Sequence, residues 1–408
     1  MNPRHPVAAR VAVACACIAL ATLTVFAGPA RPVFPVGAGF SRPASADATR
    51  TLKYGSPASA GIDPAALDRG VDLFRQAIDR DELRGAVLLV ARRGTIVLHE
   101  ALGWRHRGYR LPMERNTIFR MASNTKPVVA SAVLILEQDG TLAVADKVSK
   151  HLPAFDTYRT RDITLFHLLT HSSGFRIAPI FYPFDEEMKK GETPTLQDAV
   201  AKFAKEGPAV APGTTYSYSN PGYNTLGAIV ERASGMPLEP FLKARIYDPL
   251  GMTDTLNHED PVKLHRMATV YRGRKGADGR IEFTQGFTPD DAPDYPIVRA
   301  SGGLISTAMD YAKFLQMYLN KGVYGDARIL TEASIAKATT PHVKIDETSH
   351  YGLGWSVAPG GVFSHGGSDG TYAWVDPSRD LFGLVFTQSP GGINPREEFQ
   401  KIVTGACK

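Results

Sequence analysis

The sequence predicts an α/β fold of the α+β kind: an antiparallel sheet flanked by helices, built from both chain ends, with an inserted, mostly helical domain. Short β-rich runs bounded by turn residues occur near the start, at 85–90 and 95–104, and again in the last quarter of the 408 residues. The stretch between them carries apolar residues at helical spacing and long loops. Strands at both ends with helices between them indicate one sheet assembled from distant segments.

The chain begins with features typical of an export signal. Arg4 and Arg10 precede an apolar run over 11–27, and this order matches the charged and apolar regions of a secretory peptide. We predict a signal peptide over 1–27, cleaved after Ala27, with Ala46 as a second possible site. An uncleaved anchor is the alternative, although the run is short for a membrane span. We therefore expect an exported protein, periplasmic or secreted, without stable membrane insertion after cleavage.

The charge balance excludes nucleic acid as a partner. Lys and Arg number 46 and Asp and Glu 41. Four of the arginines lie within residues 1–46, which hold no acid, so the rest of the chain is close to neutral. Outside the predicted signal, Cys407 is the single cysteine, which predicts neither a disulfide framework nor a thiolate metal site. We expect no metal and no cofactor, and the oligomeric state stays open.

The remaining elements follow in order along the chain. Residues 28–60 are rich in Pro, Gly, Ala and Ser and predict a flexible segment. We assign 61–115 and 297–408 to the sheet domain and 116–296 to the helical domain, with the active site between them. Apolar spacing predicts helices at 63–78, 128–138, 196–204, 222–233, 238–246 and 395–403, and β-rich runs predict late strands at 351–357, 362–365, 372–375 and 381–387.

The first candidate for chemistry is M-A-S-N-T-K over 121–126. It stands just before an apolar stretch, so we expect it at the start of a helix. Residues three apart share a helix face, so the amine of Lys126 can reach the hydroxyl of Ser123. A helix N-terminus also favours negative charge developing on the serine oxygen. The alternative is an N-cap serine followed by a solvated lysine, because S-x-x-K is common.

The second candidate is P-G-T-T-Y-S-Y-S-N over 212–220. Tyr218 and Asn220 are two residues apart in what we expect to be an extended loop, so both can face one cleft. The phenol can relay a proton, and the amide can bind a substrate amide or ester. An aromatic-rich loop packed on the core is the alternative.

The third candidate is the run His365-Gly366-Gly367-Ser368, on a strand expected to edge the cleft. Glycines let the backbone come close to a ligand. A backbone N–H that follows them can bind an oxyanion. The alternative is a simple turn between two strands.

Taken together, the three motifs resemble the superfamily of serine β-lactamases and penicillin-binding proteins. They are most similar to its branch of class C β-lactamases, DD-peptidases, D-aminopeptidases and family VIII carboxylesterases. That branch has S-x-x-K, Y-x-N and a (K/H/W)-(T/S/G)-G triplet in this order. L-L-T-H-S-S-G over 168–174 and Y-G-L-G-W over 351–355 strengthen the similarity, which spans roughly residues 55–390. The resemblance implies a serine β-lactamase/DD-peptidase-like fold.

The resemblance also implies roles for these residues. Ser123 would be the acylated nucleophile, with Lys126 and Tyr218 sharing its proton. Which of the two is the acylation base stays open, since lysine needs a depressed pKa to accept a proton at neutral pH. The substrate would be bound by the side chains of Asn220 and His365 and by the backbone of Gly366, Gly367 and Ser368, with the N–H groups of Ser123 and Ser368 as the oxyanion hole.

Two other patterns are weaker. G-G-S-D-G over 366–370 spells the nucleophile elbow of α/β-hydrolases, but that fold needs a histidine downstream and none follows His365. His167 and His171 have a zinc-like spacing, but Leu168 and Leu169 lie between them, and the glutamate that a metalloprotease needs there is absent. We therefore expect His167 and His171 to be a packed or loop-fixing pair.

Three functions remain. The first is a carboxylesterase-like hydrolase of small esters, and the second is an amide or lactam hydrolase: a D-aminopeptidase, DD-peptidase or β-lactamase. The third is a non-catalytic, penicillin-binding-like sensor, disfavoured because every residue that the chemistry requires is present. His365 stands where a β-lactamase has lysine, and histidine is mostly uncharged at neutral pH, which weakens attraction for a substrate carboxylate. We therefore predict the esterase, acting on a small-molecule ester or amide.

Overall fold

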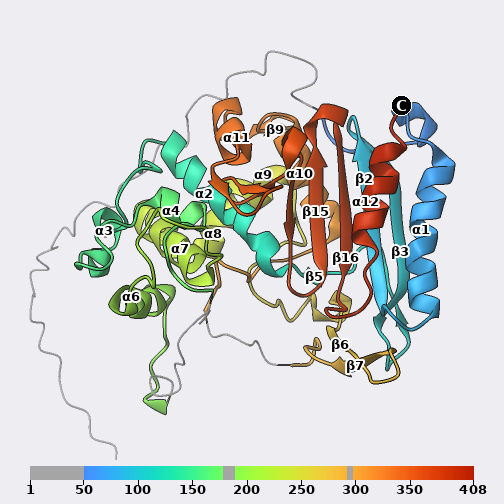
Figure 1. The fold of residues 1–408 in the computed structure, drawn as a ribbon, viewed down its shortest axis with the longest axis horizontal. Coiled ribbons are helices and arrows are strands. Elements are labelled where there is room, and N and C mark those ends of the chain that lie inside the picture. Colours follow the sequence, from blue (N-terminus) through green and yellow to red (C-terminus); the bar gives the residue numbers. More distant parts are fainter. Residues whose placement is uncertain (1–49, 178–188, 292–296) are drawn as a thin grey trace, which may run out of the picture. The chain divides into compact units, whose positions relative to one another are not determined.

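A ten-stranded sheet runs through the part of the computed structural model that is described, residues 50–177, 189–291 and 297–408 (Figure 1). Its strands are antiparallel to their neighbours except the first pair, which is parallel. In spatial order they are β1 (Lys53–Tyr54), β3 (Thr95–His106), β2 (Gly85–Arg92), β16 (Leu381–Thr387), β15 (Thr371–Asp376), β14 (Phe363–Gly366), β13 (Ser356–Val357), β12 (His350–Tyr351) and β11 (Val343–Lys344), with β4 (Leu111–Pro112) on β3.

The join between β2 and β16 brings the two ends of the chain together. Leu381 lies opposite Arg92, and the pairing continues to Thr387 opposite Ala86. This confirms the predicted fold class, a sheet built from both chain ends and flanked by helices. The main helices are α1 (Pro64–Asp79), α2 (Thr125–Gln138), α4 (Leu165–Leu169), α6 (Leu196–Glu206), α7 (Asn220–Ser234), α8 (Leu238–Leu242), α10 (Ala308–Leu319), α11 (Glu332–Thr339) and α12 (Arg396–Gly405).

Strand β2 explains why helices cover both faces of the sheet. All of its residues are buried, and successive side chains of a strand point to opposite faces. Leu88 packs with Phe74 of α1 and Phe399 of α12, the two helices on one face in Figure 1. Val87 and Leu89 belong instead to the large cluster that contains α2 and α10. Because both faces of β2 are covered, its sequence is an almost continuous apolar run.

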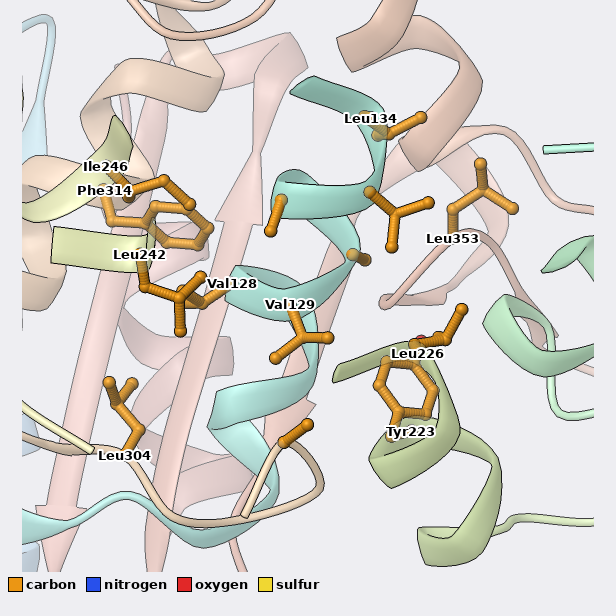
Figure 2. Packing of buried hydrophobic residues seen from close by; sticks show 14 of the residues in the cluster. Val128, Val129, Leu134, Tyr223, Leu226, Leu242, Ile246, Leu304, Phe314 and Leu353 are labelled. Carbon is orange, nitrogen blue, oxygen red and sulfur yellow. The ribbon is translucent and has the colours of Figure 1, made fainter. Parts of the chain in front are cut away.

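Helix α2 lies inside that large cluster (Figure 2). Every residue from Thr125 to Leu136 is buried. Val129 faces Tyr223 of α7, and Val128 faces Leu242 of α8. Close packing on all sides holds the start of α2, and with it the S-x-x-K motif, in one position. No helix in the described ranges is both long and apolar enough to cross a bilayer.

The prediction of a flexible segment over 28–60 is wrong for its last residues, 50–60. Lys53 and Tyr54 form β1, which pairs with β3, and residues 58–60 form a 3₁₀ turn. Arg50 makes an ion pair of 2.6 Å with Asp380 in the turn before β16. These pairings close the edge of the sheet, and composition alone does not reveal them. The predicted signal peptide and residues 28–49 lie outside the described residues.

The strand predicted over 351–357 is broken into β12 and β13. Gly354 has φ +89°, and a methyl group there would stand 2.7 Å from Cβ of Ala130 on α2. The chain therefore dips toward α2 between the two strands, at a residue that only glycine suits.

Candidate active site

Ser123 lies in a 3₁₀ turn, Ala122–Asn124, immediately before α2. Ala122 has φ +45°, a conformation that costs an ordinary residue energy and that is found at functional sites. The hydroxyl of Thr125 donates to the Ala122 carbonyl at 2.7 Å, and Met121 N–H donates to the Leu304 carbonyl at 2.8 Å. Bonds on both sides thus maintain the strained turn that presents Ser123.

The amine of Lys126 lies beside the hydroxyl of Ser123, as the helical spacing predicts. Its Nζ lies 3.0 Å from Ser123 Oγ. It also donates to Asn220 Oδ1 at 3.0 Å and to the Ser301 carbonyl at 2.7 Å. The side chain is fully buried, so these three oxygens form its immediate polar surroundings in the described structure.

Burial changes the acidity of this amine. Desolvation lowers the pKa of Lys126 well below its usual value, and the positive charge of Arg299 lowers the pKa further. The neutral amine can accept a proton at neutral pH, whereas an exposed lysine cannot. The pKa of Lys126 is therefore shifted in the direction that a lysine base requires.

Tyr218 lies against both groups. Lys126 Nζ is 4.6 Å from the centre of the Tyr218 ring. Burial raises the pKa of Tyr218, and the hydrogen bond of its hydroxyl to Ser123 lowers the pKa by less. The phenol is therefore protonated at neutral pH and can donate or relay a proton. Tyr218, Ser123 and Lys126 come together in one site.

Asn220 is the first residue of α7, with Ser219 as the N-cap, so the expected extended loop ends two residues earlier than predicted. The Ser219 hydroxyl accepts from Gly222 N–H at 3.0 Å, which explains the helix start. The Asn220 amide accepts from Lys126 and donates to the Ile177 carbonyl at 3.3 Å. It therefore orients the amine in this structure.

His365 on β14 is buried and uncharged. Its Nε2 lies 2.9 Å from the Tyr351 hydroxyl, and its Nδ1 lies 2.9 Å from the Gly366 carbonyl. A carbonyl only accepts, so Nδ1 carries the proton and Nε2 accepts from Tyr351. Burial lowers the pKa of His365 to about 3, and the charge of Lys126 contributes. The position that holds a lysine in a β-lactamase is neutral here.

The turn after β14 packs directly on residues 121–124, the turn that holds Ser123. Thr371 donates from Oγ1 to the Met121 carbonyl at 3.0 Å and accepts from the Asn124 amide at 2.9 Å. A methyl group on Gly367 would stand 2.4 Å from the Met121 oxygen, so glycine permits this approach. Ser368 follows in the turn and is exposed. The third motif is thus brought beside the first.

A fourth segment completes the site and carries no motif that we recognised. The Ser301 N–H donates to Asn224 Oδ1 at 3.0 Å, while the Ser301 carbonyl accepts from Lys126. Leu304 N–H donates to Thr125 Oγ1 at 3.0 Å. A buried Asn224 inside an otherwise apolar helix pattern is the sequence signal that could have pointed to it, because buried amides need partners.

The two histidines of the zinc-like pair serve backbone groups. His167 accepts from Thr164 N–H at 3.2 Å and completes the N-terminal cap of α4. His171 accepts at Nδ1 from Ser219 N–H at 3.0 Å. Within the described ranges no group of three or more His, Cys, Asp or Glu is placed to hold a metal. The pair fixes loops.

Comparison with known proteins gives the family. The Beta-lactamase family profile matches residues 71–401. Protein Rv1367c of Mycobacterium tuberculosis (strain ATCC 25618 / H37Rv) is 30% identical over 366 residues, 79% of this chain and 90% of the relative. N-acetylmuramyl-L-alanine amidase of Bacillus subtilis (strain 168) is 30% identical, over 75% of this chain and 78% of the relative.

Among solved structures, that of EstCE1, a hydrolase with promiscuous acyltransferase activity, has a similar fold. The TM-score is 0.70 and the identity 23%, over 83% of this chain and 98% of the other. The fold, the matched family and the contact between Ser123 and the buried Lys126 agree with one another. The chain belongs to the β-lactamase family and is a serine hydrolase of the superfamily that contains the serine β-lactamases and penicillin-binding proteins.

Proposed function

We propose that this enzyme is an exported carboxylesterase-like hydrolase that cleaves small, uncharged esters through an acyl-enzyme on Ser123. The observation that carries the substrate preference is the neutral His365, whose Nε2 is held by the Tyr351 hydroxyl. A lysine in this position would offer a permanent cation to a substrate carboxylate. An uncharged imidazole offers none, so it favours substrates without one.

Lys126 acts as the acylation base. Ser123 Oγ attacks the ester carbonyl as its proton passes to the neutral Lys126 amine, 3.0 Å away. The two pKa shifts support this assignment over Tyr218, because burial lowers the pKa of Lys126 and raises the pKa of Tyr218. Lys126 is ready to accept a proton, and Tyr218 is ready to pass one on.

The remaining steps pass the proton on to the leaving alcohol and then regenerate the enzyme. As the tetrahedral intermediate collapses, the carbon–oxygen bond to the alcohol breaks, and the proton on Lys126 reaches the leaving oxygen through Tyr218. Water then attacks the acyl-enzyme and gives a proton to Lys126. As the bond between the acyl carbon and Ser123 Oγ breaks, that proton passes to Oγ, so the acid is released and both the serine hydroxyl and the neutral amine are restored. The backbone N–H groups of Ser123 and Ser368 stabilise the oxyanion in both steps. No metal or cofactor takes part.

An amide hydrolase is the second candidate, because a relative at 30% identity bears the name N-acetylmuramyl-L-alanine amidase. Purified mature protein, from residue 28 onward, should be compared on p-nitrophenyl acetate and butyrate, nitrocefin and D-alanyl amides. The proposal predicts that kcat/KM is highest on the two esters. A higher kcat/KM on the amides or the lactam would favour the second candidate.

The His365→Lys variant tests the reason for the preference. A new cation should raise kcat/KM for carboxylate-bearing lactams relative to short esters. A charge contact contributes about 1–3 kcal/mol, which corresponds to a change of about 5- to 150-fold in that ratio. An equal loss on both substrates would show that His365 only packs against Tyr351, and the ester preference would lose its physical basis.

A further inference from the structure

We propose that His171 is a positioning residue that holds the phenol of Tyr218 against Ser123 and Lys126. The proposal rests on the function proposed above, in which Tyr218 relays protons. It assigns a role to a histidine that does not touch the reacting atoms. Three independent contacts carry it.

The first two contacts are hydrogen bonds on either side of Tyr218. The Ser217 N–H donates to the His171 carbonyl at 2.7 Å, and the Ser219 N–H donates to His171 Nδ1 at 3.0 Å. A single residue thus fixes the backbone immediately before and immediately after the tyrosine. With both flanking amides held, the Tyr218 backbone has little freedom to rotate or shift.

The third contact is made by the ring itself. The centroids of the His171 and Tyr218 rings are 4.3 Å apart with an angle of 36° between the planes. The imidazole also contacts Tyr351 on β12, with the ring centroids 4.6 Å apart, and Tyr351 bonds His365 on β14. His171 therefore contacts both the tyrosine of the second motif and the partner of the histidine of the third.

Burial and backbone conformation show how specific this placement is. His171 is fully buried, and its φ of +58° is unfavourable for most side chains and better tolerated by Asn, Asp and His. Because Nδ1 accepts from an amide, it is unprotonated, and burial lowers the pKa of His171 well below its usual value. The single acceptor nitrogen of the neutral ring is already taken by the Ser219 N–H, so His171 cannot be the acylation base for Ser123.

His171→Asn separates these contributions. Asparagine tolerates φ near +58° and presents a carbonyl oxygen close to the position of Nδ1, but it removes the ring from Tyr218. We expect kcat on p-nitrophenyl acetate to fall about 10- to 100-fold with KM changed less than about 3-fold, as for misplaced catalytic groups. The matched control is His167→Asn, four residues earlier, where Nδ1 accepts from Thr164. Its kcat should stay within about 3-fold of wild type.

A double-mutant cycle with Tyr218→Phe measures whether the losses in kcat of the two variants are additive. A general structural role of His171 would leave the losses additive. If His171 acts through the Tyr218 hydroxyl, adding His171→Asn to Tyr218→Phe should cost less than about 3-fold further in kcat. Independent, multiplicative losses would overturn the proposal, and so would an equal loss in the His167→Asn control. If His171→Asn does not fold, judged by circular dichroism and thermal melting, His171→Gly replaces it: glycine adopts φ near +58° freely, and this variant removes both the ring and the acceptor. The same cycle should then be non-additive, and additive losses would again overturn the proposal.

The same variants distinguish a failure of the positioning role of His171 from a failure of the proposed catalytic role of Tyr218. If Tyr218→Phe has full activity, the proposed role of Tyr218 fails and takes the role of His171 with it. If Tyr218→Phe is impaired and His171→Asn is not, the catalytic proposal stands and only the positioning role is lost.

Discussion

Lys126 shows how one residue links burial to catalysis. Its amine has no solvent contact, and its partners are one serine hydroxyl, one amide oxygen and one backbone carbonyl. None of these carries a negative charge, so nothing in this set compensates the ammonium form for the lost water. The pKa of Lys126 falls for that reason, so the same burial that costs stability at neutral pH also suits the amine to the proposed role of base.

This predicts the pH dependence of the enzyme. As the pH falls through the pKa of Lys126, the amine binds a proton and can no longer accept one, so kcat/KM should fall by about one log unit per pH unit. This fall in kcat/KM cannot come from protonation of His365, whose pKa is lowered to about 3. Ester hydrolysis measured against pH checks this, with circular dichroism at each pH to show that the fold persists. A profile that stays flat down to the pKa of His365 would contradict Lys126 as the base.

At this scale the sequence predicts local contacts well and distant ones poorly. The contact between Ser123 and Lys126 follows from their separation by three residues, which places both on one face of a helical turn. Their approach to Tyr218 and His365 was inferred from the order of the motifs, since no local pattern requires it. Ser301 enters through its backbone carbonyl, and a backbone group can be supplied by any residue type, so no side-chain pattern reveals it.

Among the elements, the turn between β14 and β15 is fixed to residues 121–124 by side chains as well as by close packing. The Asn124 amide, the Thr371 hydroxyl and the Met121 carbonyl form a short chain of hydrogen bonds. Gly367 N–H donates to the Thr371 carbonyl at 2.7 Å. These contacts set the spacing between the two proposed oxyanion-hole amides.

Gly367→Ala should therefore disrupt catalysis. The new methyl group would stand 2.3 Å from Thr371 Oγ1 and 2.4 Å from the Met121 carbonyl oxygen, so the turn must move away from Ser123. We expect kcat on p-nitrophenyl acetate to fall about 100-fold. Gly405→Ala on α12, where no atom lies within 4 Å of the new Cβ, is the control. Equal activity in the two variants would show that the turn does not set the geometry of the oxyanion hole.

The element boundaries show where local patterns suffice. Strand β16 has the predicted limits, 381–387, because its apolar run is bounded by turn residues on both sides. The strand predicted over 351–357 divides at Gly354 because the chain packs on Ala130 of a distant helix. Helix α10 is buried on most sides, so its sequence lacks a polar face that would mark it as amphipathic.

For the molecule as a whole, Arg92 connects parts that are far apart in sequence. Its guanidinium, almost fully buried, donates to the carbonyls of Ala60, Gly61, Arg379 and Lys408. These groups belong to the start of the described chain, the turn before β16 and the C-terminal residue. The arginine thus holds together the two chain ends that build the sheet, on a strand that contributes no residue to the proposed site.

Arg92→Met should destabilise the fold without changing the chemistry. Four carbonyl acceptors would lose their partner, and we expect the free energy of unfolding to fall by about 2–4 kcal/mol. Urea unfolding measures this, and kcat at 25 °C should stay close to wild type. The neighbouring exposed Arg93 provides the control, because Arg93→Met should change the free energy by less than about 0.5 kcal/mol. Equal stability of the two variants would show that Arg92 does not hold the ends together.

Every proposed step of the hydrolysis depends on Ser123 as the nucleophile. A fluorophosphonate probe reacts with an activated serine, and peptide mass spectrometry identifies the residue that carries the label. We expect one adduct, on Ser123, with no labelling of Ser123→Ala and a loss of roughly 10⁴-fold or more in its ester turnover. An adduct on Ser368, or a Ser123→Ala variant that keeps its activity, would show that Ser123 is not the nucleophile.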